Sequence, residues 1–363
     1  MAPIRVLHIV TYMGRAGLET MLMNYYRNID REKVQFDFLV HRDFEADYDA
    51  EILSLGGKIY RLPKLNPFSK SYRKTLDNFF KERTEYKIVH SHLDCMSSIP
   101  LKYAKKNNVP VRIAHSHNSN QDRDAKYLLK LFYRNKIKKY ATDLFSCSIE
   151  AGKWMFKTDN FTVLNNAIDA AKYSYNKETS AKVRADLGIS DNALVIGLVA
   201  RFATQKNHNF LIDVFANLKS KNENSVLLLV GDGELKDQIS AKIKNKGLES
   251  DVIFTGVRSD VNALLQAMDV FVMPSFNEGL PVSIIEAQAA GLPCLISNNV
   301  PLECAITDNV KSLSLDETLD VWSATILELS KLPRKDQYKN ICDFGFDICS
   351  NAKQLQEYYL KSN

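Results

Sequence analysis

Residues 269–297 read DVFVMPSFNEGLPVSIIEAQAAGLPCLIS. The apolar run 269–273 predicts a buried strand, and a loop containing Gly279 follows it. Pro281 suits the first turn of a helix that runs to Gly291, and residues 292–297 predict the next strand. In such a unit the loop lies at the carboxyl edge of a parallel sheet. The N–H groups of the helix start point outward there and favour phosphate binding.

Two carboxylates frame this helix start, Glu278 just before the helix and Glu286 inside it. A carboxylate beside a phosphate site repels the phosphate unless it binds another part of the ligand. Sugar hydroxyls are the obvious partners, because an ionised carboxylate accepts several hydrogen bonds. The alternative is that Glu286 faces solvent and that Glu278 only caps the helix.

Two cations precede this unit in the segment VIGLVARFATQKNHNFLIDVF, residues 195–215. A predicted strand delivers Arg201 and Lys206 into a loop, and a helix starts near Asn207. Fixed cations at the carboxyl edge of a strand suit a diphosphate whose charge grows as a leaving group departs. The alternative is two solvated basic side chains at a strand end.

Residues 274–287, PSFNEGLPVSIIEA, closely resemble the donor-binding segment of glycosyltransferase family 4, whose members are retaining enzymes of GT-B fold. The G-x-x-x-R-x-x-x-x-K pattern that ends at Lys206 matches the same family. The resemblance covers nearly all of the chain and is strongest to enzymes that build bacterial capsular polysaccharides or exopolysaccharides. It implies that Arg201 and Lys206 bind the donor diphosphate, that Glu278 orients the sugar and that Glu286 holds the ribose.

The resemblance also implies further donor contacts. These are the backbone around Gly279, Leu280, Pro281 and Val282, the backbone near Val257 at the nucleotide base, and Gly17 after the first strand. Family members often carry two adjacent glycines followed by Glu. Here Ala16 takes the first position, while Gly17 and Glu19 are kept.

Histidines gather in the first half, as HSH at 90–92 and HSHN at 115–118. The resemblance identifies His92 as the active-site histidine, and His115, His117 and Asn118 are candidate acceptor contacts. Zinc is the alternative, because histidine is a common metal ligand. No Cys or Glu recurs nearby at ligand spacing.

Strand–helix alternation occurs twice, which predicts an α/β chain of two Rossmann-like domains with parallel sheets. By resemblance this is a GT-B fold, with the domains facing each other across a cleft and the C-terminal helix crossing back to the first. We expect an acceptor domain at 1–170, a donor domain at 171–345 and the returning helix at about 346–363. The polar segment 169–180 is the predicted linker.

The composition is that of a globular protein. No run approaches the roughly 20 apolar residues of a membrane span. No nucleic-acid partner is expected. The six cysteines form no CxxC pair, so buried thiols in a cytoplasmic protein are expected. Residues 1–170 hold 28 Lys and Arg against 19 Asp and Glu, which suggests an anionic partner. A basic amphipathic helix at 124–140 either contacts an anionic membrane at the inner face of the cell membrane or packs by its apolar side.

Metal-dependent sugar transfer usually requires an Asp-x-Asp motif. Residues 47–49 and 122–124 match its letters, but both lie in polar segments that we expect to be exposed. Arg201 and Lys206 would make a divalent ion unnecessary, so no metal and no cofactor are predicted.

The expected function is retaining transfer of a hexose or N-acetylhexosamine from a nucleotide diphosphate sugar, in particular a UDP-sugar, to a glycan or lipid-linked glycan. Two alternatives remain. One is a nucleotide-sugar 2-epimerase of the same fold, and the other is a non-catalytic subunit that binds sugar nucleotides.

Overall fold

The computed structural model describes residues 2–118 and 126–362 of the 363-residue chain. Contacts divide the chain into two compact units. The first unit comprises Met1–Ala167 and Ile348–Asn363, and the second unit comprises Ile168–Asp347. The sequence-based boundaries are residue 170 and about residue 346. Each unit is an α/β domain built on a parallel sheet, as predicted.

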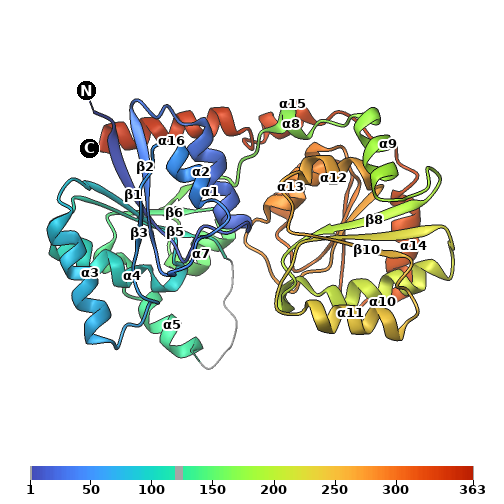
Figure 1. Ribbon diagram of the computed structural model, residues 1–363, viewed down its shortest axis with the longest axis horizontal. Coiled ribbons are helices and arrows are strands. Elements are labelled where there is room, and N and C mark those ends of the chain that lie inside the picture. The colour runs from blue at the N-terminus through green and yellow to red at the C-terminus, as the bar shows by residue number, and fades with distance from the viewer. Residues whose placement is uncertain (1, 119–125, 363) are drawn as a thin grey trace. The chain divides into compact units, whose positions relative to one another are not determined.

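A seven-stranded sheet forms the centre of the first unit, in the order β3-β2-β1-β4-β5-β6-β7 (Figure 1). Helices cover both faces of this sheet, which explains why every residue of β2 is buried, including the polar residues Gln35 and Asp37. The strands are β1 (Ile4–Ile9), β2 (Val34–Val40), β3 (Ile59–Arg61), β4 (Ile88–Ser91), β5 (Val111–Ser116), β6 (Asp143–Ser146) and β7 (Thr162–Val163).

The first unit has these helices: α1 (Gly17–Asn28), α2 (Asp49–Ser54), α3 (Lys70–Glu82), η1 (Asp94–Ser97), α4 (Ser98–Lys106), α5 (Tyr127–Arg134), α6 (Ile137–Tyr140), α7 (Ile149–Phe156) and α16 (Ile348–Ser362). The single helix predicted at 124–140 is wrong. The chain forms α5 and α6 instead, interrupted at Asn135, a residue type that favours helix ends. Residues 124 and 125 of that prediction lie outside the described residues.

The C-terminal helix α16 belongs to the first unit, as the fold prediction requires. It packs against α1, β1 and β2. The side-chain oxygen of Gln356 accepts a hydrogen bond of 2.7 Å from the backbone N–H of Asp30. Tyr359 is buried. The return of the chain to the first domain is thus confirmed.

The second unit repeats the architecture with six parallel strands in the order β10-β9-β8-β11-β12-β13. The strands are β8 (Leu194–Val199), β9 (Ser225–Val230), β10 (Val252–Gly256), β11 (Val270–Met273), β12 (Cys294–Ser297) and β13 (Val310–Leu313). Its helices are α8 (Ala170–Tyr173), α9 (Lys177–Asp186), η2 (Thr204–Lys206), α10 (His208–Lys219), α11 (Lys236–Asn245), α12 (Val261–Ala267), α13 (Val282–Ala289), η3 (Leu302–Cys304), α14 (Leu319–Leu329) and α15 (Tyr338–Asp343). Helices α10 and α11 cover one face of the sheet, and α12 and α13 cover the other (Figure 1).

The predicted linker at 169–180 is mostly helical. Asp169 caps α8 by accepting a hydrogen bond from the Lys172 N–H, and Asn176 caps α9 in the same way through the Thr179 N–H. Helix α8 packs on α13 and α12 within the second unit. The polar residues that suggested a loop are therefore helix caps, a position where Asp and Asn are strongly favoured.

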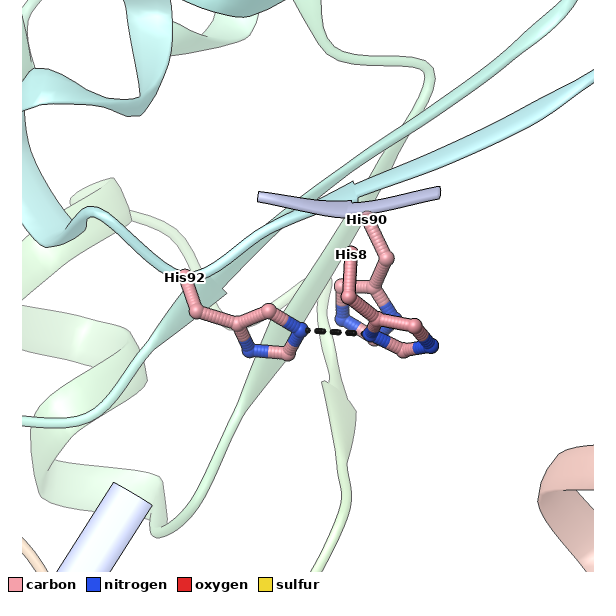
Figure 2. Close-up of side chains that lie close together, drawn as sticks. All are labelled: His8, His90 and His92. Atoms are coloured by element: carbon pink, nitrogen blue, oxygen red, sulfur yellow. Dashed lines mark hydrogen bonds between the residues drawn. The ribbon is translucent and has the colours of Figure 1, made fainter. Parts of the chain in front are cut away.

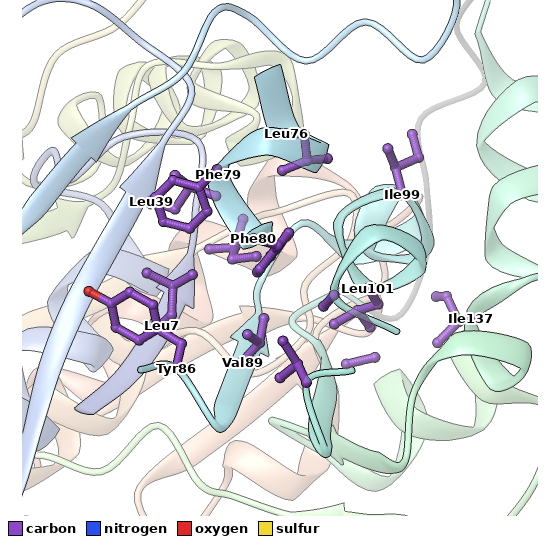
Figure 3. Packing of buried hydrophobic residues seen from close by; sticks show 14 of the residues in the cluster. Leu7, Leu39, Leu76, Phe79, Phe80, Tyr86, Val89, Ile99, Leu101 and Ile137 are labelled. Atoms are coloured by element: carbon purple, nitrogen blue, oxygen red, sulfur yellow. The ribbon is translucent and has the colours of Figure 1, made fainter. Parts of the chain in front are cut away.

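A continuous hydrophobic core lies beneath one face of the first sheet (Figure 3). Strand residues Leu7 and Val89 meet Phe80 of α3 and Leu101 of α4, and all four are at most 1% exposed. Burying side chains of this size stabilises the fold by about 1.5–3 kcal/mol each. This packing fixes the carboxyl ends of β1 and β4.

In both sheets the strand order reverses at an equivalent place, beside the first strand of the unit. In the first unit the first strand, β1, pairs with β2 on one side and β4 on the other. In the second unit β8 pairs likewise with β9 and β11. The carboxyl ends of such neighbouring strands form the ligand-binding crevice of open α/β sheets. The loops that follow β1, β4, β8 and β11 therefore hold the candidate sites.

Four of the six cysteines, Cys95, Cys147, Cys294 and Cys304, are buried, as expected. Cys342 is partly exposed and Cys349 is exposed. Across residues 2–118 and 126–362, no helix combines the length and apolar character that a bilayer span requires.

Candidate functional site

The loops after β8 and β11 are joined by an ion pair between two predicted site residues. Lys206 Nζ lies 2.5 Å from Glu278 Oε1. The Glu278 side chain is only 5% exposed and that of Lys206 18%. The prediction assigned these residues to different parts of one ligand. The structure brings them into direct contact, so the Lys206 ammonium is already fixed in position.

Gln205 reinforces the same junction and was not singled out from the sequence. Its side-chain amide donates a hydrogen bond of 2.7 Å to the carbonyl of Asn277. Its backbone carbonyl accepts one of 2.8 Å from the N–H of Phe276. These bonds hold the backbone beside Lys206 against the backbone beside Glu278. A lone Gln in a loop carries no sequence signal of such a role.

Arg201 lies on the same β8 loop but is far more accessible. Its guanidinium is 58% exposed and its nearest carboxylate, Glu234, is 3.8 Å away. The loop is supported by the turn after β9, where a Cβ on Gly231 would lie 2.1 Å from the carbonyl oxygen of Ala200. Glycine is needed at residue 231, whose φ is +135°. Arg201 therefore has a fixed backbone and a side chain that is accessible to an anion.

Helix α13 starts at Val282 directly after the loop that carries Glu278. Pro281 precedes it with an extended backbone and provides no side-chain cap. Gly279, Leu280, Pro281 and Val282 thus lie at the helix start, as predicted. The positive end of the helix dipole and outward-pointing N–H groups favour an anion at this place.

Glu286 is 5% exposed, so the alternative of a solvent-facing Glu286 is wrong. The hydroxyl of Tyr173 in α8 donates a hydrogen bond of 2.6 Å to Glu286 Oε1. Burial raises the pKa of the Glu286 carboxyl, while the bond from Tyr173 opposes that rise. Tyr173 was missed because it lies in the segment predicted as a linker, more than 100 residues away in sequence.

Val257 follows β10 and is 49% exposed, so its backbone turn is accessible. Next to it, Arg258 makes two hydrogen bonds of 2.8 and 2.7 Å to the Asp260 carboxylate. This pair fixes the turn after β10. In the sheet, a single strand, β9, lies between β10 and β8.

In the first unit, Gly17 is the first residue of α1, at the carboxyl end of β1. A Cβ added at Gly17 would meet no protein atom within 4 Å. Packing within the protein therefore does not require glycine at this position. The space beside Gly17 remains open to a ligand.

Five histidines from the neighbouring strands β1, β4 and β5 and from the loops after β4 and β5 form two hydrogen-bonded chains. In the first chain His8 Nδ1 lies 3.0 Å from His92 Nε2, and His92 Nδ1 lies 2.9 Å from His117 Nε2. Figure 2 shows His8 and His92 joined in this way beside His90. Both ring nitrogens of His92 therefore have histidine partners.

The second chain runs parallel to the first. The Tyr359 hydroxyl lies 2.7 Å from His90 Nδ1, and His90 Nε2 lies 3.1 Å from His115 Nδ1. Burial lowers the pKa of all five histidines, which keeps the rings neutral. His90 is a buried histidine with both ring nitrogens in hydrogen bonds. His8 and Tyr359 were missed, although His8 inside an apolar strand is an unusual polar residue.

Asp94 positions the two candidate acceptor contacts that follow β5. Its carboxylate accepts a hydrogen bond of 3.0 Å from the His117 N–H and one of 2.9 Å from the Asn118 amide. The backbone of Asp94 is left-handed, with φ of 44°. His115, His117 and Asn118 thus lie together beside His92.

In the Asp-x-Asp motif at 47–49, Asp47 is exposed as expected, but Asp49 is 3% exposed and forms an ion pair with Arg61. Asp47 accepts a hydrogen bond from the Arg15 N–H. The second motif, at 122–124, lies outside the described residues. Among those that are described, the two groups of side chains able to hold a metal ion consist of histidines alone.

Two parallel-sheet α/β domains and the returning C-terminal helix define the GT-B fold of glycosyltransferases. Among solved structures, Anabaena Alr3699/HepE in complex with UDP and glucose superposes with a TM-score of 0.81 at 18% identity, over 98% of this chain and 99% of that one. Residues 179–341 match the family described as "Glycosyl transferases group 1".

Two relatives extend over almost the whole chain. "Putative glycosyltransferase EpsF" of Bacillus subtilis (strain 168) is 38% identical, covering 98% of this chain and 96% of the relative. The "Capsular polysaccharide biosynthesis glycosyltransferase CapH" of Staphylococcus aureus is 26% identical, covering 98% and 99%. The chain therefore belongs to the group 1 glycosyltransferases.

Proposed function

We propose that the protein is a family 4, retaining and metal-independent glycosyltransferase of bacterial polysaccharide synthesis that uses a UDP-sugar donor. The Lys206–Glu278 pair at the junction of the β8 and β11 loops carries this proposal. It puts a cation and an acid at the start of helix α13, whose dipole and first N–H groups favour an anionic ligand with hydroxyl groups. The UDP and glucose complex of the HepE structure and the polysaccharide role in the CapH name support the choice of substrates.

In the second unit, Arg201 and Lys206 stabilise the departing diphosphate together with the N–H groups of residues 280–282. Glu278 orients the sugar ring, and Glu286 accepts hydrogen bonds from the ribose. The turn at Val257 meets the nucleotide base. Fixed donors aimed at developing negative charge are worth about 2.7–4 kcal/mol each. Two such cations do the work that a divalent ion does in metal-dependent transferases.

In the first unit, Gly17 gives the diphosphate close access to the backbone of α1. His92 positions the hexose, and its neutral ring tolerates positive charge at the anomeric carbon better than a charged ring would. Its contact with a hydroxyl requires exchange of one histidine bond. The bond to His117 is the exchangeable one, because His117 is only half-buried. His115, His117 and Asn118 contact the acceptor.

The reaction breaks the bond between the anomeric carbon and the phosphate oxygen and forms a bond to the acceptor oxygen on the same face. The departing phosphate oxygen takes the proton of the acceptor hydroxyl. A glycan or lipid-linked glycan supplies that hydroxyl. Helix α5 supports a lipid-linked acceptor and contact with an anionic membrane at the inner face of the cell membrane, because Leu128 is 79% and Phe132 53% exposed amid basic residues.

The test is transfer from a panel of nucleotide sugars to a lipid-linked glycan, with the configuration of the first product determined by NMR. Retention with a UDP-sugar, unchanged by excess chelator, is the expected result. Inversion, or loss of transfer in chelator, would contradict the proposal. Interconversion of donor sugars without an acceptor would favour the epimerase instead.

A further inference from the structure

We propose that His92, His115 and His117 form a binding site for a divalent transition-metal ion of the zinc type. One ring nitrogen of each histidine lies within 4.8 Å of the corresponding nitrogens of the other two. Imidazole nitrogen suits Zn²⁺, Co²⁺ and Ni²⁺ rather than Mg²⁺. Three histidines with an open fourth position are a known arrangement for zinc.

The hydrogen-bond pattern around the three rings favours this ligand set. His115 Nε2 is buried and has no hydrogen-bond partner among residues 2–118 and 126–362, whereas its Nδ1 is bonded to His90. His92 Nε2 is bonded to His8. Each of these two rings therefore has one nitrogen held by a second histidine and one directed elsewhere. Metal-bound histidines almost always donate a hydrogen bond from their other ring N–H, which orients the ring.

A single set of neutral tautomers keeps the hydrogen bonds to the supporting histidines and leaves a lone pair on each nitrogen that binds the metal. With the protons on His92 Nε2 and His115 Nδ1, these nitrogens donate to His8 Nδ1 and His90 Nε2, and His90 Nδ1–H then donates to the Tyr359 oxygen. His92 Nδ1, His115 Nε2 and His117 Nε2 keep lone pairs for the metal. In the metal-free state with these tautomers, His117 Nε2–H donates to His92 Nδ1. When the metal binds, the His117 proton changes from Nε2 to Nδ1 of the same ring, so no net proton is released.

The movement required between His92 and His117 is small. His92 Nδ1 and His117 Nε2 are 2.9 Å apart. Tetrahedral zinc with bonds of about 2.0–2.1 Å separates its ligand nitrogens by about 3.3 Å. The two rings must therefore open by a few tenths of an ångström. His117 can move because it is half-buried, and it provides the entry path.

The other histidine triplet, His8, His90 and His92, lacks these properties. All three rings are buried, and Figure 2 shows them packed closely together. Both nitrogens of His90 are in hydrogen bonds, one with Tyr359 and one with His115. This triplet has neither an entry path nor enough available nitrogens, so its members serve as the outer support of the proposed site.

A bound ion would compete with transfer, a consequence that rests on the proposed function. It would hold His92 and His117 against exchange with a hexose hydroxyl. Zinc should then inhibit transfer reversibly, and chelator should restore activity. The metal is an inhibitor in this inference and takes no part in the chemistry.

The test uses the untagged full-length protein titrated with Co²⁺, whose tetrahedral complexes absorb strongly in the visible range. We expect a single site whose absorption Zn²⁺ abolishes by displacement. His117→Asn should lose this site. Tyr359→Phe, which removes only the hydroxyl behind His90, should weaken binding about 10–100-fold, as loss of an outer-shell partner does. His208→Asn, a buried histidine of the second unit, is the matched control and should bind as the wild type.

Circular dichroism and thermal unfolding establish that each variant is folded, and a rise in Tm with Zn²⁺ in the wild type but not in His117→Asn is a second measure. Absence of a Co²⁺ spectrum and of a Tm rise, or equal affinity in His117→Asn, would overturn the metal site. Zinc binding without inhibition would retain the metal site and remove His92 from the proposed catalysis, so the two failures are distinguishable.

Discussion

Lys206 and Glu278 are 72 positions apart in the chain, yet their side chains meet at 2.5 Å. They do so because β8 and β11 are neighbours in the sheet and the loops after both strands rise at the same edge. The contact neutralises a buried carboxylate and holds a cation beside the start of α13. The predictions below test what this arrangement and its surroundings do.

Replacement of Lys206 by alanine should lower transfer 10²–10³-fold, about 2.7–4 kcal/mol in barrier, because the departing diphosphate loses a fixed donor. Initial rates with a UDP-sugar measure the effect. Lys236→Ala is the matched control, since Lys236 pairs with Asp232 on the surface of the same unit. Near-normal transfer by Lys206→Ala would remove this residue from the site.

Replacement of Tyr173 by phenylalanine should move the acid limb of donor binding to higher pH. Glu286 binds ribose hydroxyls when ionised, so binding is lost as the pH falls through its pKa. Burial raises that pKa and the Tyr173 hydroxyl lowers it. Loss of the hydroxyl therefore raises it further. Calorimetric titration of UDP from about pH 5 to about pH 8 follows the shift.

The control for this change is Tyr175→Phe, which alters a neighbouring tyrosine that is 40% exposed. Its acid limb should match the wild type. An unshifted limb in Tyr173→Phe would show that Glu286 does not titrate during nucleotide binding.

Gly17→Ala should leave stability unchanged or raise it by about 0.4–1 kcal/mol, because the new methyl meets no protein atom and the unfolded chain loses freedom. Donor KM should rise, since the methyl occupies the space that we assign to the diphosphate. Thermal unfolding and initial rates measure the two effects separately.

Gly231→Ala provides the opposite case. Its Cβ would overlap the Ala200 carbonyl, so a loss of about 1–3 kcal/mol in unfolding free energy is expected. If Gly17→Ala binds donor as tightly as the wild type, the α1 start does not contact the diphosphate.

Leu128→Glu should reduce co-sedimentation with anionic vesicles at low salt, because it places a charge on the exposed apolar side of α5. Leu302→Glu is the control, since Leu302 is 66% exposed in the second unit. If the wild-type protein fails to bind the vesicles, α5 is a solvated surface helix and the membrane proposal ends.

The sequence by itself determined the repeated strand–helix order, the GT-B fold and the position of most candidate residues at the ends of strands. These features are local: apolar runs, helix starts and short motifs such as 274–287 are read within a few residues. Even Glu286 could be singled out, because residues 274–287 resemble the donor-binding segment of the glycosyltransferase family.

Only the tertiary structure decided which side chains meet. The partners Tyr173 and Gln205, and the chains that join His8 to His117 and Tyr359 to His115, come from segments far apart in sequence. Such contacts depend on strand order and on how helices pack on the sheet. The tertiary structure also decided that Asp49 and Glu286 are buried. The sequence does not distinguish a buried carboxylate from one in solvent.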